Sequence, residues 1–230
     1  MRRFLPLGLG LLAATACAAP APFDLHYVVS RDGKAIGTSQ VRLAPAPGGD
    51  WSLVTETRGT NGMARLLGLE VREQSRLRWR EGRPEGLSYD YRQDAAIKHK
   101  QRHAEFDWGV GEVQVSEGSR EYRYAVDAGT VDRHAVALAL GEALAAGRRE
   151  AQLAVAVKDH VEQQQYRVAG EEELRLPAGN YRTLKVERTD APGKIVSWYA
   201  PQVAPMPVRL EQTQGDGSVI VMELQRVGGG

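Results

Sequence analysis

Apolar residues recur at every second position through most of this chain, and turn-forming residues interrupt the alternation about every ten positions. Successive side chains of a β-strand point to opposite faces, so this spacing predicts strands with one buried face. The run FDLHYVVS at residues 23–30, for example, meets the turn sequence Arg31-Asp32-Gly33-Lys34 and leaves it as AIGTSQVRL. Short turns of this kind join neighbouring strands, so the pattern predicts an antiparallel meander.

Alternating runs extend from residue 23 to residue 227, and we expect them to form about ten to twelve strands. Gly170 separates two such runs, at residues 161–170 and 171–177. The next turn, in LPAGNYRTLKVER, has leucines alternating with charged residues on both sides. Pro177 can preset φ there, and Gly179 or Asn180 can adopt a positive φ. We therefore interpret this segment as a hairpin turn with no chemical role.

One segment interrupts the strands, TVDRHAVALALGEALAAG at residues 130–147. Its alanines and leucines predict a helix near 131–147, with Asp132 as N-cap and Gly147 where a left-handed residue ends it. A second, shorter helical turn is expected at residues 62–68. One long helix among many strands predicts a curved sheet or half-open barrel that this helix covers. We expect one β-rich domain over residues 23–228.

The first eighteen residues have the pattern of a signal peptide. Arg2 and Arg3 precede the uncharged apolar run from Phe4 to Ala14, and small residues follow. Cleavage near 16/17 or near 18/19 fits these residues. The apolar run is shorter than the ~20 residues that a membrane-spanning helix needs. The sequence therefore predicts an exported protein, periplasmic or associated with the outer membrane, as in Gram-negative bacteria.

Cys17 is the single cysteine of the chain. The segment Ala14-Thr15-Ala16-Cys17 is similar to a permissive lipobox, in which Cys17 would carry the lipid anchor of a bacterial lipoprotein. The alternative is that Cys17 is removed with the signal peptide. In either case the domain itself lacks a disulfide, so its stability must come from a packed core.

The net charge of the chain bears on whether it binds nucleic acid. Loss of Arg2 and Arg3 with a signal peptide leaves 28 basic residues against 29 acidic ones, a formal net charge of −1. That balance gives no reason to expect nucleic-acid binding.

Motifs of catalysis are missing from the sequence. GTSQV has Val41 where a nucleophile elbow needs glycine, and the glycine-rich stretches GVGEVQ and GDGSVI lack the third glycine of a phosphate-binding loop. His99 and His103 would lie ~13 Å apart on a strand, too far for one metal ion without other ligands. We therefore expect no catalytic residue, no metal and no cofactor.

Two acidic residues could each orient a histidine. Asp159 directly precedes His160, and Asp132 lies two residues before His134. Neither pair comes with a serine in an activated sequence setting, so we interpret both as chance neighbours.

The most notable polar pattern is basic. By the period-two rule, one strand face carries four cations and a later strand repeats the pattern with three more. These residues are Arg72, Arg76, Arg78 and Arg80 on the first strand, and Lys98, Lys100 and Arg102 on the second. If the two strands lie close in the sheet, we expect a positive stripe that meets lipid phosphate, an acidic glycan or an acidic partner. The alternative is an outward face that charge keeps soluble.

Six segments, in this order, resemble a family of bacterial exported proteins, domain of unknown function 3108. They are FDLHYVVSRDGKAIGTSQVRL, RLRWREGRPEGLSYDY, AEFDWGVGEV, VDRHAVALALGEAL, LPAGNYRTLKVER and SWYAPQVAPMPVRLEQTQGDG. The resemblance covers nearly the whole chain after the signal peptide. It implies an exported β protein and carries over no catalytic residue. One departure is the helix start at residues 132–135, where a short polar segment with serine is expected. The architecture is also similar to that of periplasmic lipoprotein carriers, half-barrels with a helical lid.

The leading hypothesis is therefore a non-catalytic envelope protein that binds an apolar or amphiphilic ligand, or a partner protein, in or beside a β half-barrel. A first alternative is an envelope scaffold or assembly factor that acts through its outer surface. A second is a hydrolase that uses Asp159, His160 and an unrecognised nucleophile. Membrane contact is expected only through a lipid on Cys17. The oligomeric state is left open.

Overall fold

The computed structural model describes residues 20–96, 98–191, 193 and 195–228. Fifteen strands of this part of the chain form one sheet. The strands of the first half are β1 (Phe23–Arg31), β2 (Lys34–Pro45), β3 (Trp51–Gly59), β4 (Glu70–Arg80), β5 (Arg83–Ala95), β6 (Lys98–Asp107), β7 (Glu112–Glu117) and β8 (Arg120–Ala125). Those of the second half are β9 (Val131–Asp132), β10 (Glu150–Ala156), β11 (Val161–Leu176), β12 (Gly179–Arg188), β13 (Ile195–Tyr199), β14 (Pro207–Thr213) and β15 (Val219–Val227). The helices are α1 (Gly62–Leu66), α2 (Val136–Ala145) and a short 3₁₀ turn, η1 (Pro47–Gly49).

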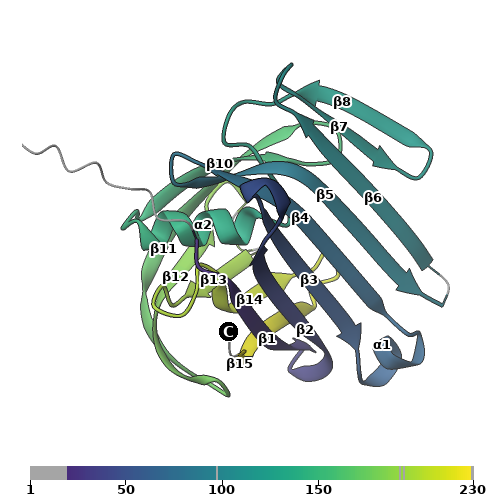
Figure 1. Ribbon diagram of the computed structural model, residues 1–230. Coiled ribbons are helices and arrows are strands. Elements are labelled where there is room, and N and C mark those ends of the chain that lie inside the picture. Colours follow the sequence, from purple (N-terminus) through teal and green to yellow (C-terminus); the bar gives the residue numbers. More distant parts are fainter. Residues whose placement is uncertain (1–19, 97, 192, 194, 229–230) are drawn as a thin grey trace, which may run out of the picture.

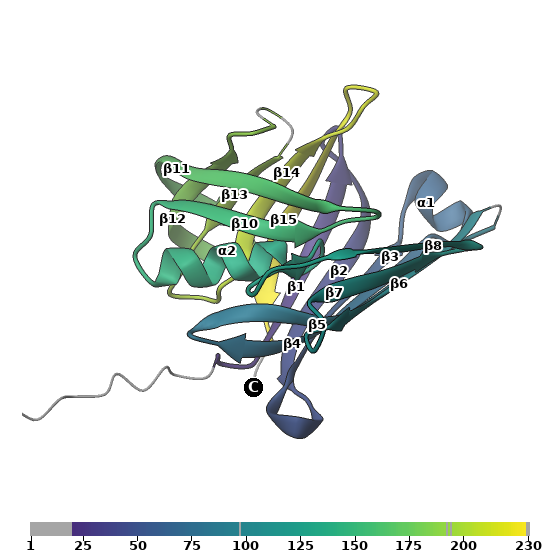
Figure 2. The same cartoon turned by 90° about the horizontal axis from the view of Figure 1, so that it is seen from above.

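Strand order follows the chain, with one exception. The first and last strands, β1 and β15, pair in the middle of the sheet, so β8 and β9 become its two ends. Every pair is antiparallel apart from the two-residue parallel pairing of β9 with β10. Figure 1 shows α2 on the concave side of this curved sheet, and Figure 2 shows β3–β8 diverging from the strands β10–β15.

Tight turns set the register of the hairpins. Asp32 and Gly33 between β1 and β2 both have positive φ, 49° and 75°. Glu81 and Gly82 between β4 and β5 repeat this geometry with 50° and 75°. Two successive residues with positive φ form the turn whose twist matches that of the strands it joins. These turns explain why short local patterns specify most of the meander.

The interior of the curved sheet is filled with side chains. Leu25, Leu53, Leu77, Leu138 and Leu224 are almost fully buried in one cluster that joins the central strands to the underside of α2. Leu140 and Leu144 of α2 pack in a second cluster, which includes Tyr199 of β13. A third cluster lies between β5–β8 and the start of β11. Neither α1 nor α2 is long and apolar enough to cross a bilayer.

The hairpin turn in LPAGNYRTLKVER joins β11 to β12, as predicted. Gly179 takes the positive φ, 140°, and the backbone N–H of Ala178 donates to the carbonyl of Leu224 on β15 at 3.3 Å. The turn thus also attaches the long β11–β12 hairpin to a distant strand. The structure adds a packing role that the local pattern did not reveal.

The expected fold class is confirmed: a mainly β chain with an open, curved antiparallel sheet that one helix covers. The expected number of strands, about ten to twelve, is wrong, because the sheet has fifteen. Strands as short as β7 and β13 still pair with neighbours on both sides. The runs at 161–170 and 171–177 form one strand, β11, with an irregularity between Val168 and Gly170.

The expected helices are present with changed bounds. Residues 131–132 form β9, and α2 begins at Val136. Its end follows the prediction, since Gly147 has φ 81° and the N–H groups of Gly147 and Arg148 return to Leu144 and Ala143. The expected signal peptide, its cleavage sites and Cys17 lie outside the described residues. The extent of the domain, 23–228, stays a prediction.

Candidate functional site

The two halves of the curved sheet approach each other at a seam between β5 and β10. In the described part of the chain, the segment at residues 128–132 bridges this seam. The N–H of Gly86 on β5 donates to the carbonyl of Thr130 at 3.0 Å, and Val131 and Asp132 pair with β10. A cavity of about 560 Å³ opens beside this bridge. Its walls come from the β4–β5 turn, residues 128–129, one side of α2 and strand β10.

Small side chains on α2 leave the space for this cavity. Ala139, Glu142, Ala143 and Ala146 line it, and their spacing of three or four residues places them on one side of the helix. Gly141 lies on another side, where a Cβ atom would come within 2.1 Å of the carbonyl oxygen of Pro205. That close approach holds α2 against the loop before β14, so the helix forms a fixed wall of the cavity.

The charged groups of the cavity are few. Burial raises the pKa of the half-buried Glu142 carboxyl, and no ion pair involves this residue in the described part of the chain. Arg83 and Arg148 also line the cavity. Arg83 has only a long contact of 3.8 Å with the exposed Glu81. The cavity therefore combines an alanine-rich wall with two acidic groups, Glu81 and Glu142, and two basic ones.

A buried polar network fixes the start of α2. The Asp132 carboxylate is fully buried, and its Oδ1 accepts the backbone N–H groups of His134 and Ala135 at 2.9 and 3.1 Å. It also accepts the Ser75 hydroxyl from β4 at 2.8 Å. Burial raises the pKa of Asp132. Asp132 thus caps the turn that leads into α2, close to the N-cap role expected for it.

His134 extends this network to β3. Its Nδ1 lies 2.8 Å from the Ser75 hydroxyl, and its Nε2 lies 2.8 Å from the Thr55 hydroxyl. Ser75 has one proton, which it donates to Asp132, so Nδ1 of a neutral His134 donates to Ser75 and Nε2 accepts from Thr55. The sequence alone does not reveal this arrangement, because Thr55 and Ser75 lie far from Asp132 along the chain. The only local signal was the Asp-x-His spacing.

The other candidate histidine pairs have simpler surroundings. Asp159 and His160 form an exposed pair at 2.7 Å, and no serine or threonine in the described part of the chain hydrogen-bonds to His160. His99 and His103 each contact a carboxylate of β5, those of Asp94 and Asp90. Among the described residues, no three potential ligands of the His, Cys, Asp and Glu types gather at one point.

The basic residues of β4 lie on one face, as the alternation predicts, but each has a carboxylate nearby. Arg72 pairs with Glu56 and Arg76 with Asp50, while Arg78 and Arg80 both approach the buried Glu85. The contacts of Arg76, Arg78 and Arg80 are 2.8, 2.5 and 3.7 Å long. These ion pairs neutralise much of the positive charge expected there.

The cations of β6 do not join those of β4. Arg72 pairs with Arg92 on β5, and Arg92 pairs with Gln101 on β6, so these three side chains lie on one face of the sheet. Residues 98, 100 and 102 alternate with Gln101 and therefore point to the opposite face. Lys98 is exposed, while Lys100 and Arg102 both bind Glu117, at 2.9 and 2.8 Å. The expected single positive stripe is therefore wrong. Binding by either set alone stays a prediction.

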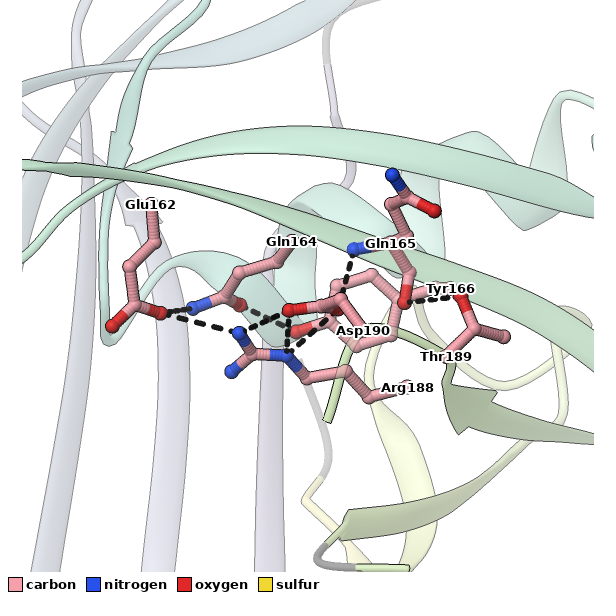
Figure 3. Close-up of polar contacts among 7 residues, drawn as sticks. All are labelled: Glu162, Gln164, Gln165, Tyr166, Arg188, Thr189 and Asp190. Atoms are coloured by element: carbon pink, nitrogen blue, oxygen red, sulfur yellow. Dashed lines mark hydrogen bonds and ion pairs between the residues drawn. The ribbon is translucent and has the colours of Figure 1, made fainter. Parts of the chain in front are cut away.

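Arg188 on β12 is the centre of a polar cluster that no sequence pattern indicates (Figure 3). Its guanidinium contacts both carboxylate oxygens of Asp190, the shortest contact at 2.6 Å, and reaches Glu162 on β11 at 3.2 Å. Gln164 links Glu162 to the hydroxyl of Tyr166. Hydrogen bonding to Arg188 lowers the pKa of Asp190 to about 2. The charge of Arg188 is thus satisfied internally, and the cluster ties β11 to the end of β12.

A scan against protein-family models finds one match, DUF3108, a protein family of unknown function, over residues 23–225. The match begins with β1 and ends within β15. No curated protein matches the chain.

Two solved structures are similar to this chain. The first is a β-barrel-like protein of the domain of unknown function DUF1849 from Brucella abortus. It has a TM-score of 0.50 and 12% identity, and the alignment covers 90% of this chain and 96% of that one. The second, from Parabacteroides distasonis, is described as a "putative lipoprotein". It has a TM-score of 0.38 and 10% identity, and the alignment covers 90% and 95% of the two chains. At such identities the first similarity concerns the fold alone.

Proposed function

Because the chain belongs to the DUF3108 family, whose description assigns no function, we propose its function from its own geometry. We propose that it is a non-catalytic protein of the cell envelope that binds an amphiphilic ligand in the cavity beside α2. The observation that carries this proposal is the cavity of about 560 Å³ at the open seam of the sheet. Ligand sites typically measure about 300–1,000 Å³.

The lining supports an amphiphile over a purely polar ligand. Ala139 and Ala143 of α2, Ala146 directly after this helix, and Leu153 of β10 all line the cavity, which gives an apolar surface for a chain or ring. Arg83 and Arg148, which line the cavity together with Glu81 and Glu142, offer hydrogen-bond donors to the headgroup of an amphiphile. Of the two binding places expected, in or beside the half-barrel, the second is supported, because side chains fill the interior of the sheet.

Location in the envelope is part of the proposal. The N-terminal segment with Arg2, Arg3 and the apolar run to Ala14 supports export to the periplasm or outer membrane. Cys17 would add a lipid anchor if cleavage occurs before it. Metabolic labelling with a radioactive fatty acid, compared between the natural chain and Cys17→Ser, tests that anchor directly.

Native mass spectrometry of the mature protein, purified from its own envelope under mild conditions, tests the ligand proposal. We expect an added mass that organic solvent removes and that lipid analysis identifies as an amphiphile. Ala143→Trp, which places an indole ring in the cavity, should remove this mass. Ala145→Trp is the matched control, since residue 145 is exposed on the same helix and lies outside the lining. A natural protein with no added mass contradicts the proposal.

Hydrolysis is a second candidate function, and one observation favours it. The Thr55 hydroxyl lies 2.8 Å from Nε2 of His134, with Ser75 and Asp132 behind the ring. This is the order of nucleophile, base and orienting groups in hydrolases. Ester turnover that both Thr55→Ala and His134→Ala abolish would support it. If neither short nor long acyl esters are hydrolysed, the hydrolase proposal is contradicted and the network has only a structural role.

A further inference from the structure

The outer edge of β8 is free in the described part of the chain, because β8 is the last strand of the sheet and its backbone pairs only with β7. The side chains of Tyr122 and Tyr124 contact Lys158 and Val157 on the inner face of the sheet. Its sequence, REYRYA, alternates charged and aromatic residues. Arg120 and Glu121 are exposed, and neither forms an ion pair among the described residues. A free edge carries unpaired backbone groups that can pair with a strand of another chain.

The β7–β8 hairpin determines which backbone groups point outward. Glu117 and Arg120 are opposite each other across a two-residue turn, so they form a hydrogen-bonded pair. The N–H of Val126, six residues after Arg120, donates to the carbonyl of Gly111 at 2.9 Å, so it points to the same side as the backbone groups of Arg120. By alternation, the backbone groups of Glu121, Arg123 and Ala125 point away from β7.

This pattern fits a second copy of the same strand. When two β8 strands run antiparallel about a two-fold axis at Tyr122, Glu121 lies opposite Arg123 of the second copy, and Arg123 lies opposite Glu121. Both pairs are made by residues whose backbone groups point outward, so they can exchange hydrogen bonds. On the other face, Tyr122 meets its own copy and Arg120 meets Tyr124, a cation and an aromatic ring.

Shifted registers are disfavoured by charge. If the two-fold axis moves from Tyr122 to the next residue, Arg123 lies opposite Arg123 of the second copy. If it moves to the preceding residue, Glu121 lies opposite Glu121. Like charges directly opposite each other destabilise a sheet. Within one chain, Arg123 has only long contacts, at 3.7 Å to Glu112 and 3.4 Å to Gln114. Its charge is therefore available to a partner strand.

We propose that two copies of this chain associate through their β8 edges, antiparallel and in the register that pairs Glu121 with Arg123. The two fifteen-stranded sheets then continue into each other. The α2 cavities stay open to ligand, because none of their lining residues belongs to β8. This association does not depend on the proposed ligand.

Sedimentation equilibrium of the mature chain from micromolar to millimolar concentration tests the proposal. We expect a reversible dimer. Glu121→Arg and Arg123→Glu each place like charges opposite each other at two symmetric points, and each should weaken the dimer about tenfold. The double variant, Glu121→Arg with Arg123→Glu, exchanges the charges and should restore the natural affinity.

Mixing the two single variants gives the sharpest result. One then carries two arginines and the other two glutamates at positions 121 and 123, so a heterodimer should form where neither variant dimerises with itself. A monomer at every concentration overturns the proposal. So does a dimer that withstands both single changes. A dimer that Arg123→Glu weakens and Glu121→Arg does not contradicts the register, since it indicates that Arg123 pairs with an acidic residue other than Glu121. Circular dichroism confirms that each variant is folded.

Discussion

The hydroxyl of Ser75 on β4 donates a hydrogen bond of 2.8 Å to the buried carboxylate of Asp132, 57 residues further along the chain. This contact joins the central sheet to the turn that starts α2, and it places the helix where it walls the cavity. The position of the proposed ligand site therefore depends on a polar network in the interior as well as on apolar packing.

Removal of the Asp132 carboxylate should destabilise the fold strongly. Asp132→Ala leaves two backbone N–H groups and the Ser75 hydroxyl without their acceptor in a buried place. We expect a loss of about 3 kcal/mol in the free energy of unfolding, measured by urea denaturation. Asp127→Ala is the control, because this exposed side chain makes no hydrogen bond among the described residues. A loss within about 0.5 kcal/mol for Asp132→Ala would show that the network is dispensable.

Gly141→Ala separates helix propensity from packing. Alanine favours an exposed helix by about 1 kcal/mol over glycine. Here its Cβ would lie 2.1 Å from the Pro205 carbonyl oxygen, so α2 or the loop must move. We expect a net destabilisation of about 2 kcal/mol in urea unfolding. Gly170→Ala, where nothing lies within 4 Å, should be neutral or stabilising. An increase in stability for Gly141→Ala would contradict the tight contact.

Acid should destabilise the protein partly through Glu117. Hydrogen bonding to Lys100, with a smaller contribution from Arg102, lowers the pKa of this carboxyl from 4.5 to about 2. Between those values the unfolded chain binds more protons than the folded one, so stability falls as pH falls through this window. We expect Glu117→Gln to flatten the decline in chemical denaturation between pH 4.5 and 2. Glu150→Gln, at an exposed residue without an ion pair in the described part of the chain, should keep the natural slope.

Glu142 should behave in the opposite way. Burial raises its pKa, so the folded chain holds this proton more tightly than the unfolded chain does. Protonated Glu142 therefore contributes its full stabilisation below the pKa that this residue has in the unfolded chain. The contribution is lost as pH rises through the higher pKa that Glu142 has in the folded chain. Glu142→Gln should therefore raise the melting temperature at pH 7 relative to the natural protein, and the gain should disappear near pH 3. An equal gain at both pH values would exclude charge burial as its cause.

Much of the fold could be predicted, because strands and tight turns are encoded locally. The alternation around Asp32–Gly33 and Pro177–Ala178 predicts both hairpins, and Gly147 predicts the end of α2. The bend of β11 at Gly170 could not be predicted, since glycine is as typical of a turn as of an irregularity inside a strand. Nor could β9, whose pairing with β10 depends on distant residues.

The site was harder to predict for the same reason. Ala143 and Ala146 belong to an ordinary helix pattern, and no local signal shows that they face open space at a seam. Thr55, Ser75 and His134 come together only when β3, β4 and the start of α2 are assembled. Lys100 and Arg72 lie on opposite faces of the sheet because of the registers of β4, β5 and β6, and the sequence alone does not specify these registers.

The most direct test of the central claim, that the α2 cavity binds an amphiphile, is a titration of the mature protein with a fluorescent long-chain fatty acid. The natural protein and Ala145→Trp should bind one equivalent with equal affinity. Ala143→Trp, which places an indole ring in the cavity, should bind at least tenfold more weakly while unfolding at the same urea concentration as Ala145→Trp. Equal binding by both tryptophan variants, or no binding by the natural protein, would contradict the account.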